Sequence, residues 1–149
     1  MAKIKIFDTK QNSIIDIEKI EKSDAEWKQI LTKKQYEITT KKGTEIPDSC
    51  LFSEVHEAGI FKCVRCSTDL FRSTTKFESG TGWPSFYKPI SQLNVVEKTD
   101  RSLGVIRTEI LCARCGSHLG HVFDDGPPPT GKRYCMNGYA LKFVREGEL

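Results

Sequence analysis

The stretch CARCGSHLGHVFDDGPPPTGKRYCMN, residues 112–137, decides the fold, because a Cys-x-x-Cys pair opens it and a separate cysteine follows. The pair, Cys112 and Cys115, has a counterpart at Cys63 and Cys66. Four thiolates can close a tetrahedral shell around Zn²⁺, and each short spacer lets two sulfur atoms point at one ion. The interval between the pairs is longer than the roughly 15–20 residues of a common zinc ribbon. We therefore expect one structural zinc ion that ties distant segments of a larger fold together.

Two other interpretations of these cysteines stay open at this point. They could be four buried free thiols, or two redox-active dithiols of the thioredoxin kind, although no βαβ pattern accompanies them. His118 and His121 could also compete as ligands. Four thiolates would fill the shell, however, and leave no open position for metal catalysis.

Cys50 and Cys135 are the remaining cysteines, and Cys135 has the neighbours that could activate a thiol. Positive charge or hydrogen-bond donors lower a thiol pKa from about 8.5, and Arg133 and Asn137 flank Cys135. His118 and His121 would point to opposite faces of an ideal strand, yet a bend could turn both toward one pocket. The competing interpretation is an inert buried cysteine beside structural histidines.

The composition is that of one ordinary globular domain. At 149 residues the chain can bury a core without disulfide support. Its net charge of +3 comes from interspersed signs, which gives little support to a nucleic-acid binder. The sequence contains no membrane-spanning apolar run and no recognisable signal peptide. We expect a cytoplasmic protein whose six cysteines serve metal binding or catalysis.

The secondary-structure pattern predicts a mainly β domain of two antiparallel sheets, stapled by zinc and opened by two short helices. Ser23 with Glu26, and Thr32 with Gln35, form capping-box patterns at the helix starts. The expected β-rich runs are Gly59–Cys63, Leu70–Phe77, Val105–Leu111, Leu119–Phe123 and Ala140–Val144. The glycine- and proline-rich residues 80–84 and 125–131 predict loops at one end of the sheets. We place the main domain at 23–146, after an N-terminal extension, residues 1–22, that forms either a strand and short helix or a loosely held arm.

Five motifs then follow one another along the chain: SGTGWPSF at 79–86, RTE at 107–109, CARCGSHLGHVF at 112–123, DGP at 125–127 and RYCMN at 133–137. Together they closely resemble the methionine-R-sulfoxide reductase (MsrB) family, from about Ser23 to Val144. The resemblance implies an oxidoreductase that repairs oxidised proteins during oxidative stress by reducing methionine-R-sulfoxide, free or in a protein, to methionine. It also makes residues 23–146 an MsrB-like catalytic domain.

The resemblance implies a role for each candidate residue. Cys135 attacks the sulfoxide sulfur and becomes a sulfenic acid as methionine leaves. His118, His121 and Asn137 match positions that polarise or protonate the sulfoxide oxygen, directly or through water. Trp83 would offer the substrate methyl group an apolar wall, the alternative being a core tryptophan. Arg133 would steady the thiolate on the substrate side, the alternative being a solvated strand charge.

The chain departs from one common family pattern at Thr81, where many relatives carry the resolving cysteine. The sulfenic acid must still be reduced, either by Cys50 through a disulfide or directly by an external thiol. The alternative for Cys50 is a bystander. The resemblance implies thioredoxin or a similar dithiol as the final reductant, and we expect a monomer.

Two rival functions remain at the level of sequence. One is a zinc-ribbon module that binds nucleic acid or protein, although no aromatic residues interleave with a basic stripe. The other is an interaction domain in which zinc is purely structural. Both leave Cys135, His118 and His121 without a common purpose.

Overall fold

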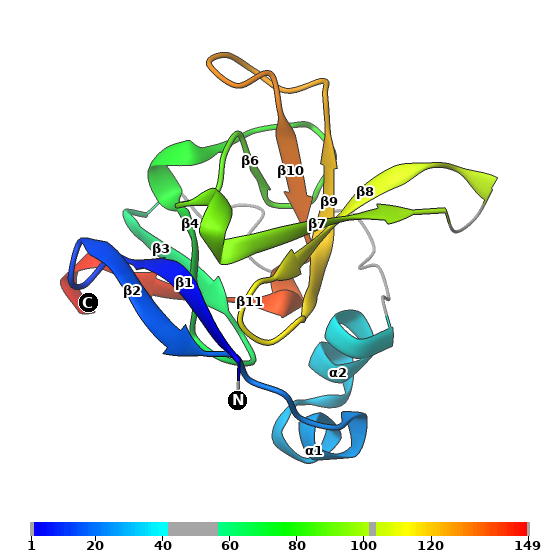
Figure 1. The fold of residues 1–149 in the computed structure, drawn as a ribbon. Helices are drawn as coiled ribbons and strands as arrows, with labels where there is room; N and C mark the ends of the chain where they lie inside the picture. Colours follow the sequence, from blue (N-terminus) through cyan, green and yellow to red (C-terminus); the bar gives the residue numbers. More distant parts are fainter. Residues whose placement is uncertain (1, 42–56, 102–103, 149) are drawn as a thin grey trace.

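The computed structural model describes residues 2–41, 57–101 and 104–148, which form a mainly β fold (Figure 1). The strands are β1 (Lys3–Asp8), β2 (Ser13–Glu18), β3 (Gly59–Cys63), β4 (Asp69–Arg72), β5 (Lys76–Phe77), β6 (Ser85–Phe86), β7 (Val95–Asp100), β8 (Arg107–Cys112), β9 (His118–Phe123), β10 (Arg133–Met136) and β11 (Leu141–Arg145). They pair antiparallel in a six-stranded sheet, β5-β6-β10-β9-β8-β7, a three-stranded sheet, β11-β3-β4, and a hairpin, β1-β2. The predicted fold class is confirmed.

An aromatic cluster joins the two larger sheets. Phe86 of the six-stranded sheet stacks on Phe71 of β4 with ring centroids 4.4 Å apart. It also meets Phe61 of β3 edge-on at 5.1 Å. All three side chains are fully buried. Aromatic pairs in these geometries add to the free energy that burial of their apolar surface contributes, so this cluster fixes the two sheets against each other.

The two capping patterns mark the starts of helices α1 (Asp24–Ile30) and α2 (Lys33–Lys41), as predicted. Ser23 Oγ accepts from the Glu26 backbone N–H, and the Glu26 carboxylate accepts from the Ser23 backbone N–H. Thr32 and Gln35 exchange the same two bonds. Neither helix has the length and hydropathy of a membrane span within the part of the chain that the structure describes.

Several strand predictions are confirmed and others differ. The run Gly59–Cys63 is β3, whereas the run Leu70–Phe77 is divided into β4 and β5 by a 3-10 turn, Ser73–Thr75. The strands β6, β7 and β10 were not predicted. Two of them are only two and four residues long, which is too short for a clear period-2 pattern.

The N-terminal residues differ from both expected forms, because residues 3–18 fold into the hairpin β1-β2 and pack on the main domain. The buried Asn94 amide accepts from the Phe7 N–H at 2.8 Å and donates to the Phe7 carbonyl at 3.0 Å. Asp69 Oδ2 accepts from both the backbone N–H and the hydroxyl of Thr9. The segment is therefore neither a strand with a helix nor a loosely held arm. The boundary at residue 22 stays a prediction.

Candidate active site and metal cluster

The four predicted metal ligands meet at one point between the two larger sheets. Cys63 is the last residue of β3 and Cys112 the last residue of β8, and Cys66 and Cys115 lie in the turns that follow these strands. Their sulfur atoms all lie within 4.8 Å of one another, with the Cys63–Cys115 and Cys66–Cys112 pairs at 3.6 Å. Ligands about 2.3 Å from a tetrahedral ion would lie about 3.8 Å apart. The donor set and its spacing therefore fit a metal ion.

The electrostatics of this cluster favour a cation. Hydrogen bonds from Cys112 and Cys115 lower the pKa of Cys66. Burial raises the pKa of the fully buried Cys63 thiol. Four ionised sulfurs this close together would repel one another, and a divalent cation removes that repulsion. The cluster can therefore bind a metal.

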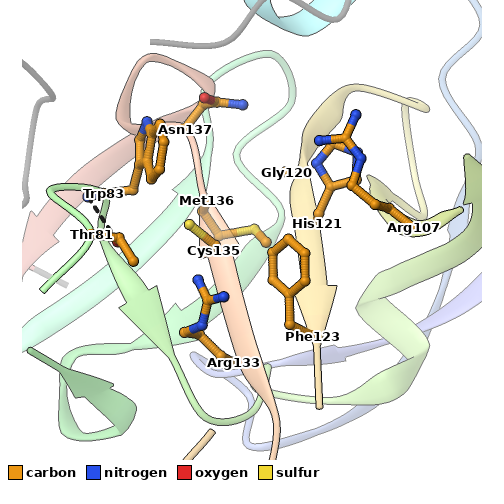
Figure 2. A pocket seen from close by; sticks show the side chains of 10 residues that line it. All are labelled: Thr81, Trp83, Arg107, Gly120, His121, Phe123, Arg133, Cys135, Met136 and Asn137. Atoms are coloured by element: carbon orange, nitrogen blue, oxygen red, sulfur yellow. Dashed lines mark hydrogen bonds between the residues drawn. The ribbon is translucent and has the colours of Figure 1, made fainter. Parts of the chain in front are cut away.

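A cavity of about 230 Å³ opens on the outer face of the six-stranded sheet (Figure 2). Its walls come from the loop before β6 and from β8, β9 and β10. The lining residues are Thr81, Trp83, Arg107, Gly120, His121, Phe123, Arg133, Cys135, Met136 and Asn137. The structure thus brings most of the predicted site residues together around one hollow.

Cys135 faces this cavity because of the alternation along β10. Tyr134 and Met136 are buried in the core, whereas Arg133 and Cys135 point the other way and are partly exposed. Directly opposite residues in an antiparallel pair share a face. Cys135 lies opposite Ser85 of β6 on one side and opposite His121 of β9 on the other. The sheet therefore sets a hydroxyl and an imidazole on either side of the thiol.

A β-bulge in β9 brings the two histidines onto one face. Gly120 lies opposite Ile110 and His118 lies opposite Leu111, so Leu119 is an extra residue in β9. His118 and His121 are three residues apart, which would place them on opposite faces of a regular strand. The extra residue places both on the same face, with their ring centroids 5.5 Å apart. The two rings do not lie equally close to the cavity, however. His121 lines it, whereas His118 is buried behind it.

Each histidine is held by a carboxylate. His118 Nδ1 lies 2.6 Å from Glu109 Oε2, and both side chains are almost fully buried. His121 Nε2 lies 2.8 Å from Asp100 Oδ2, which Arg107 also approaches at 3.4 Å. A carboxylate only accepts hydrogen bonds, so His118 donates through Nδ1 and His121 through Nε2. These contacts fix the orientation of both rings.

The bulge also positions Asn137. The Leu119 carbonyl accepts from the Asn137 backbone N–H at 2.9 Å and from its side-chain amide at 3.3 Å. Next to Leu119, Gly120 leaves room for β10, because a Cβ there would lie 2.1 Å from the Cys135 carbonyl oxygen. Only glycine fits so close a backbone approach. The β9–β10 contact therefore depends on the bulge and on Gly120.

Trp83 and Arg133 lie at the sides of the cavity. Trp83 is half-buried and lines the hollow from the loop before β6, and Gly82 before it has a positive φ of 84° that lets the loop turn. The Arg133 guanidinium lies 4.5 Å from the Phe123 ring and donates to both Asp125 carboxylate oxygens, at 2.9 and 3.2 Å. Arg133 is therefore fixed in place by stacking and an ion pair.

The environment of Cys135 has opposing effects on its thiol. Burial raises the pKa of Cys135, while the Arg133 charge and the nearby Thr81 and Ser85 hydroxyl groups act to lower it. Burial has the larger effect, so the thiol is less ionised at neutral pH than an exposed one. When a bound substrate excludes water, the ionisation of the Cys135 thiol therefore depends on these few polar neighbours.

A family model described as the SelR domain matches residues 31–145. The chain belongs to the SelR domain family. Among its relatives are proteins named peptide methionine sulfoxide reductase MsrB. The one from Methanosarcina barkeri is 54% identical over 87% of this chain and 91% of its own length. Those from Pseudomonas syringae and Herminiimonas arsenicoxydans are each 52% identical, over 86% and 89% of this chain and 98% and 96% of their own lengths. The predicted family resemblance is confirmed.

Three functional contacts of this SelR-domain protein were missed from the sequence. Glu109 contacts His118, Asp100 contacts His121, and Arg107 pairs with the same Asp100 carboxylate, whereas the motif at 107–109 predicted none of these contacts. A usable signal was Glu109 itself, a charged residue within an otherwise β-rich apolar run. Cys50, the predicted resolving cysteine, lies outside the described residues.

Proposed function

We propose that this chain is a peptide-methionine (R)-S-oxide reductase in which Cys135 is the nucleophile. The observation that carries the proposal is the position of Cys135 on the floor of a cavity, between Ser85 and His121 in the ladder. The names of its relatives, which the chain matches over most of their length, support the same activity. A sulfur nucleophile beside hydrogen-bond donors is what attack at a sulfoxide requires.

The proposed reaction transfers the sulfoxide oxygen to the enzyme. The Cys135 thiolate attacks the sulfoxide sulfur and forms a sulfur–sulfur bond, while the sulfoxide oxygen is protonated. The hydroxyl group then bonds to the Cys135 sulfur as its bond to the substrate sulfur and the sulfur–sulfur bond break. Methionine leaves, and Cys135 retains the oxygen as a sulfenic acid. The sulfur of the substrate is reduced by two electrons and that of Cys135 is oxidised by two.

The lining residues take distinct roles in this proposal. His121 and Asn137 line the cavity and would polarise or protonate the sulfoxide oxygen, while the buried His118, which does not line it, would act through water. Trp83 supports the substrate methyl group with its apolar ring. Arg133, fixed by Asp125, steadies the thiolate.

Regeneration of Cys135 consumes two thiols. They reduce the sulfenic acid to a thiol and yield one disulfide and one water molecule. We propose thioredoxin or a similar dithiol as the reductant, with Cys50 as the resolving cysteine, because Thr81 stands where many relatives carry one. The cytoplasmic location and the monomeric state stay predictions of the sequence.

We also propose that the metal is one zinc ion per chain with a structural role. The four thiolates Cys63, Cys66, Cys112 and Cys115 are the soft ligands that zinc prefers. A full shell of four protein ligands leaves no position for a substrate.

Turnover of the separate R and S sulfoxides of methionine with dithiothreitol tests the proposed activity. The wild type should produce methionine from the R epimer and not from the S epimer, and Cys135→Ser should lower the rate by at least about 1,000-fold because the nucleophile is lost. Cys50→Ser is the matched control and should retain the activity. An active Cys135→Ser variant would contradict the proposal.

The resolving role of Cys50 has its own test. With thioredoxin in place of dithiothreitol, Cys50→Ser should slow turnover by about 10-fold or more, because the disulfide that thioredoxin would reduce cannot form. Each rate is divided by the dithiothreitol rate of the same variant. An unchanged ratio would mean that the external thiol reduces Cys135 directly.

A further inference from the structure

We propose that three hydroxyl groups, those of Ser85, Ser79 and Thr81, form a directed hydrogen-bond chain that ends by donating to the sulfur of Cys135. Thr81 would thereby contact the reacting atom at the position where many relatives carry a cysteine. The inference rests on the proposed function only for the choice of Cys135 as the reacting thiol.

The distances link the three hydroxyls in sequence. Ser85 Oγ lies 2.9 Å from Ser79 Oγ, and Ser79 Oγ lies 2.7 Å from Thr81 Oγ1. Thr81 lines the cavity beside Cys135 (Figure 2). Ser85 is fully buried and lies opposite Cys135 in the ladder, so both ends of the chain adjoin the sulfur.

Two backbone donors set the direction of the chain. Ser79 Oγ accepts from the Thr81 N–H at 3.3 Å and from the Ser85 hydroxyl, which fills its two acceptor positions. Ser79 must then donate its own hydrogen to Thr81 Oγ1. Thr81 Oγ1 also accepts from the Trp83 N–H at 3.3 Å, a bond marked in Figure 2, so its acceptor positions are filled as well.

The hydrogen of Thr81 is therefore not used within the chain, and we assign it to the Cys135 sulfur, which lines the same cavity. Ser85 shares its hydrogen with the Trp83 carbonyl at 3.1 Å, a three-centre arrangement that preserves the direction toward Ser79. Hydrogen bonds in a chain polarise one another, so the last donor is stronger than an isolated hydroxyl. Such a donor favours the ionised form of the thiol, against the effect of burial.

The pH dependence of Cys135 alkylation tests the chain without any reductase assay. Zinc-loaded protein is treated with iodoacetamide between pH 6 and 10, and the Cys135 peptide is quantified by mass spectrometry. Thr81→Val removes the last hydroxyl and should raise the pH midpoint by about one pH unit. Thr81→Ser keeps the hydroxyl and should restore the wild-type midpoint. Ser79→Ala leaves Thr81 without its donor and should raise the midpoint by about half a pH unit.

The matched control is Thr75→Val, because the Thr75 hydroxyl is also buried but donates to the carbonyl oxygens of Arg72 and Lys88, away from Cys135. Its midpoint should equal that of the wild type. Arg133, His121 and Arg107 are the titratable groups that line the cavity, and all variants retain them.

Each outcome decides a part of the inference. An unshifted midpoint in Thr81→Val, or an equal shift in Thr75→Val, would overturn it. An unshifted Ser79→Ala beside a shifted Thr81→Val would overturn the chain and leave a single donor. The proposed function can fail separately from the hydrogen-bond chain. If the wild type does not reduce methionine sulfoxide but the Thr81→Val midpoint is still shifted, the proposed activity is contradicted and the chain is not.

Discussion

Burial and charge act on Cys135 in opposite directions, and the balance between them decides how reactive the thiol is. Burial raises the pKa of Cys135, and the nearby Arg133 charge opposes this effect. Arg133 is itself held by the bidentate contact with Asp125 and by the Phe123 ring. A residue with a fixed orientation delivers its charge to the same place each time, which a flexible surface side chain does not.

Replacement of Arg133 should therefore slow the chemistry of Cys135. We expect Arg133→Gln to decrease the alkylation rate of Cys135 at pH 7 by about 3- to 10-fold and to move its pH midpoint upward, because less thiolate is present at any pH below the pKa. Rates from pH 6 to 10 provide the measurement.

Lys132→Gln is the matched control for this prediction. It removes the same charge one residue away, at an exposed side chain paired with Asp124. The alkylation rate of this variant should stay within about 2-fold of the wild type, because exposed charges are screened by solvent. Equal slowing in both variants would show that net charge, and not the position of Arg133, matters.

At the level of elements, one extra residue in β9 organises much of the site. The bulge at Leu119 turns both histidines to one face, and its carbonyl holds Asn137. The sequence predicted that a bend could turn His118 and His121 toward one pocket. The structure has the bend, but of the two histidines His121 lines the cavity and His118 does not. The bulge itself could not be predicted, because an extra residue is defined only by the register of the partner strand β8.

The close approach of β9 to β10 makes Gly120 irreplaceable. Gly120→Ala would place a Cβ 2.1 Å from the Cys135 carbonyl oxygen. We expect it to decrease the free energy of unfolding by at least about 2 kcal/mol, because strand backbones must separate. Gly147→Ala, whose Cβ would meet nothing within 4 Å, should change it by less than about 0.5 kcal/mol. Urea unfolding measures both, and a Gly120→Ala variant as stable as wild type would contradict the close packing.

The sequence predicted short-range features better than long-range ones. Helix α1 was predictable because Ser23 and Glu26 lie within one turn, and the Cys-x-x-Cys pairs because their spacing is local. The N-terminal hairpin was not, since its attachment depends on Asn94, far along the chain. Strand β10 was missed for a similar reason, because four residues become a strand only between β6 and β9.

Across the whole molecule, the cysteine cluster links the two larger sheets. One cysteine pair begins at the last residue of β3 in the three-stranded sheet, and the other begins at the last residue of β8 in the six-stranded sheet. The aromatic cluster around Phe86 joins the same sheets within the core. A metal ion bound by these thiolates would therefore contribute to the stability of the whole fold.

Metal removal should destabilise the entire domain. We expect a chelator to decrease the melting temperature by more than about 10 °C, because the freed thiolates repel one another and the link between the sheets is lost. Cys63→Ser should reproduce the decrease, whereas Cys135→Ser, the same substitution outside the cluster, should retain both the metal and the melting temperature. An unchanged transition after confirmed metal loss would contradict the structural role.

Cys135 lies on β10, a strand that has hydrogen-bonded neighbours on both sides. A cysteine on a loop can swing out to meet a reductant, but Cys135 could do so only if two ladders opened, which is costly in free energy. The thiol that first reacts with the sulfenic acid, whether that of Cys50 or of an external reductant, must therefore come to the Cys135 sulfur. Because Cys135 lines a cavity, we expect a thiol at a protruding tip to reduce it faster than a thiol recessed in a flat surface. Strand β10, which holds the Cys135 nucleophile rigid, thereby also favours reductants of a particular shape.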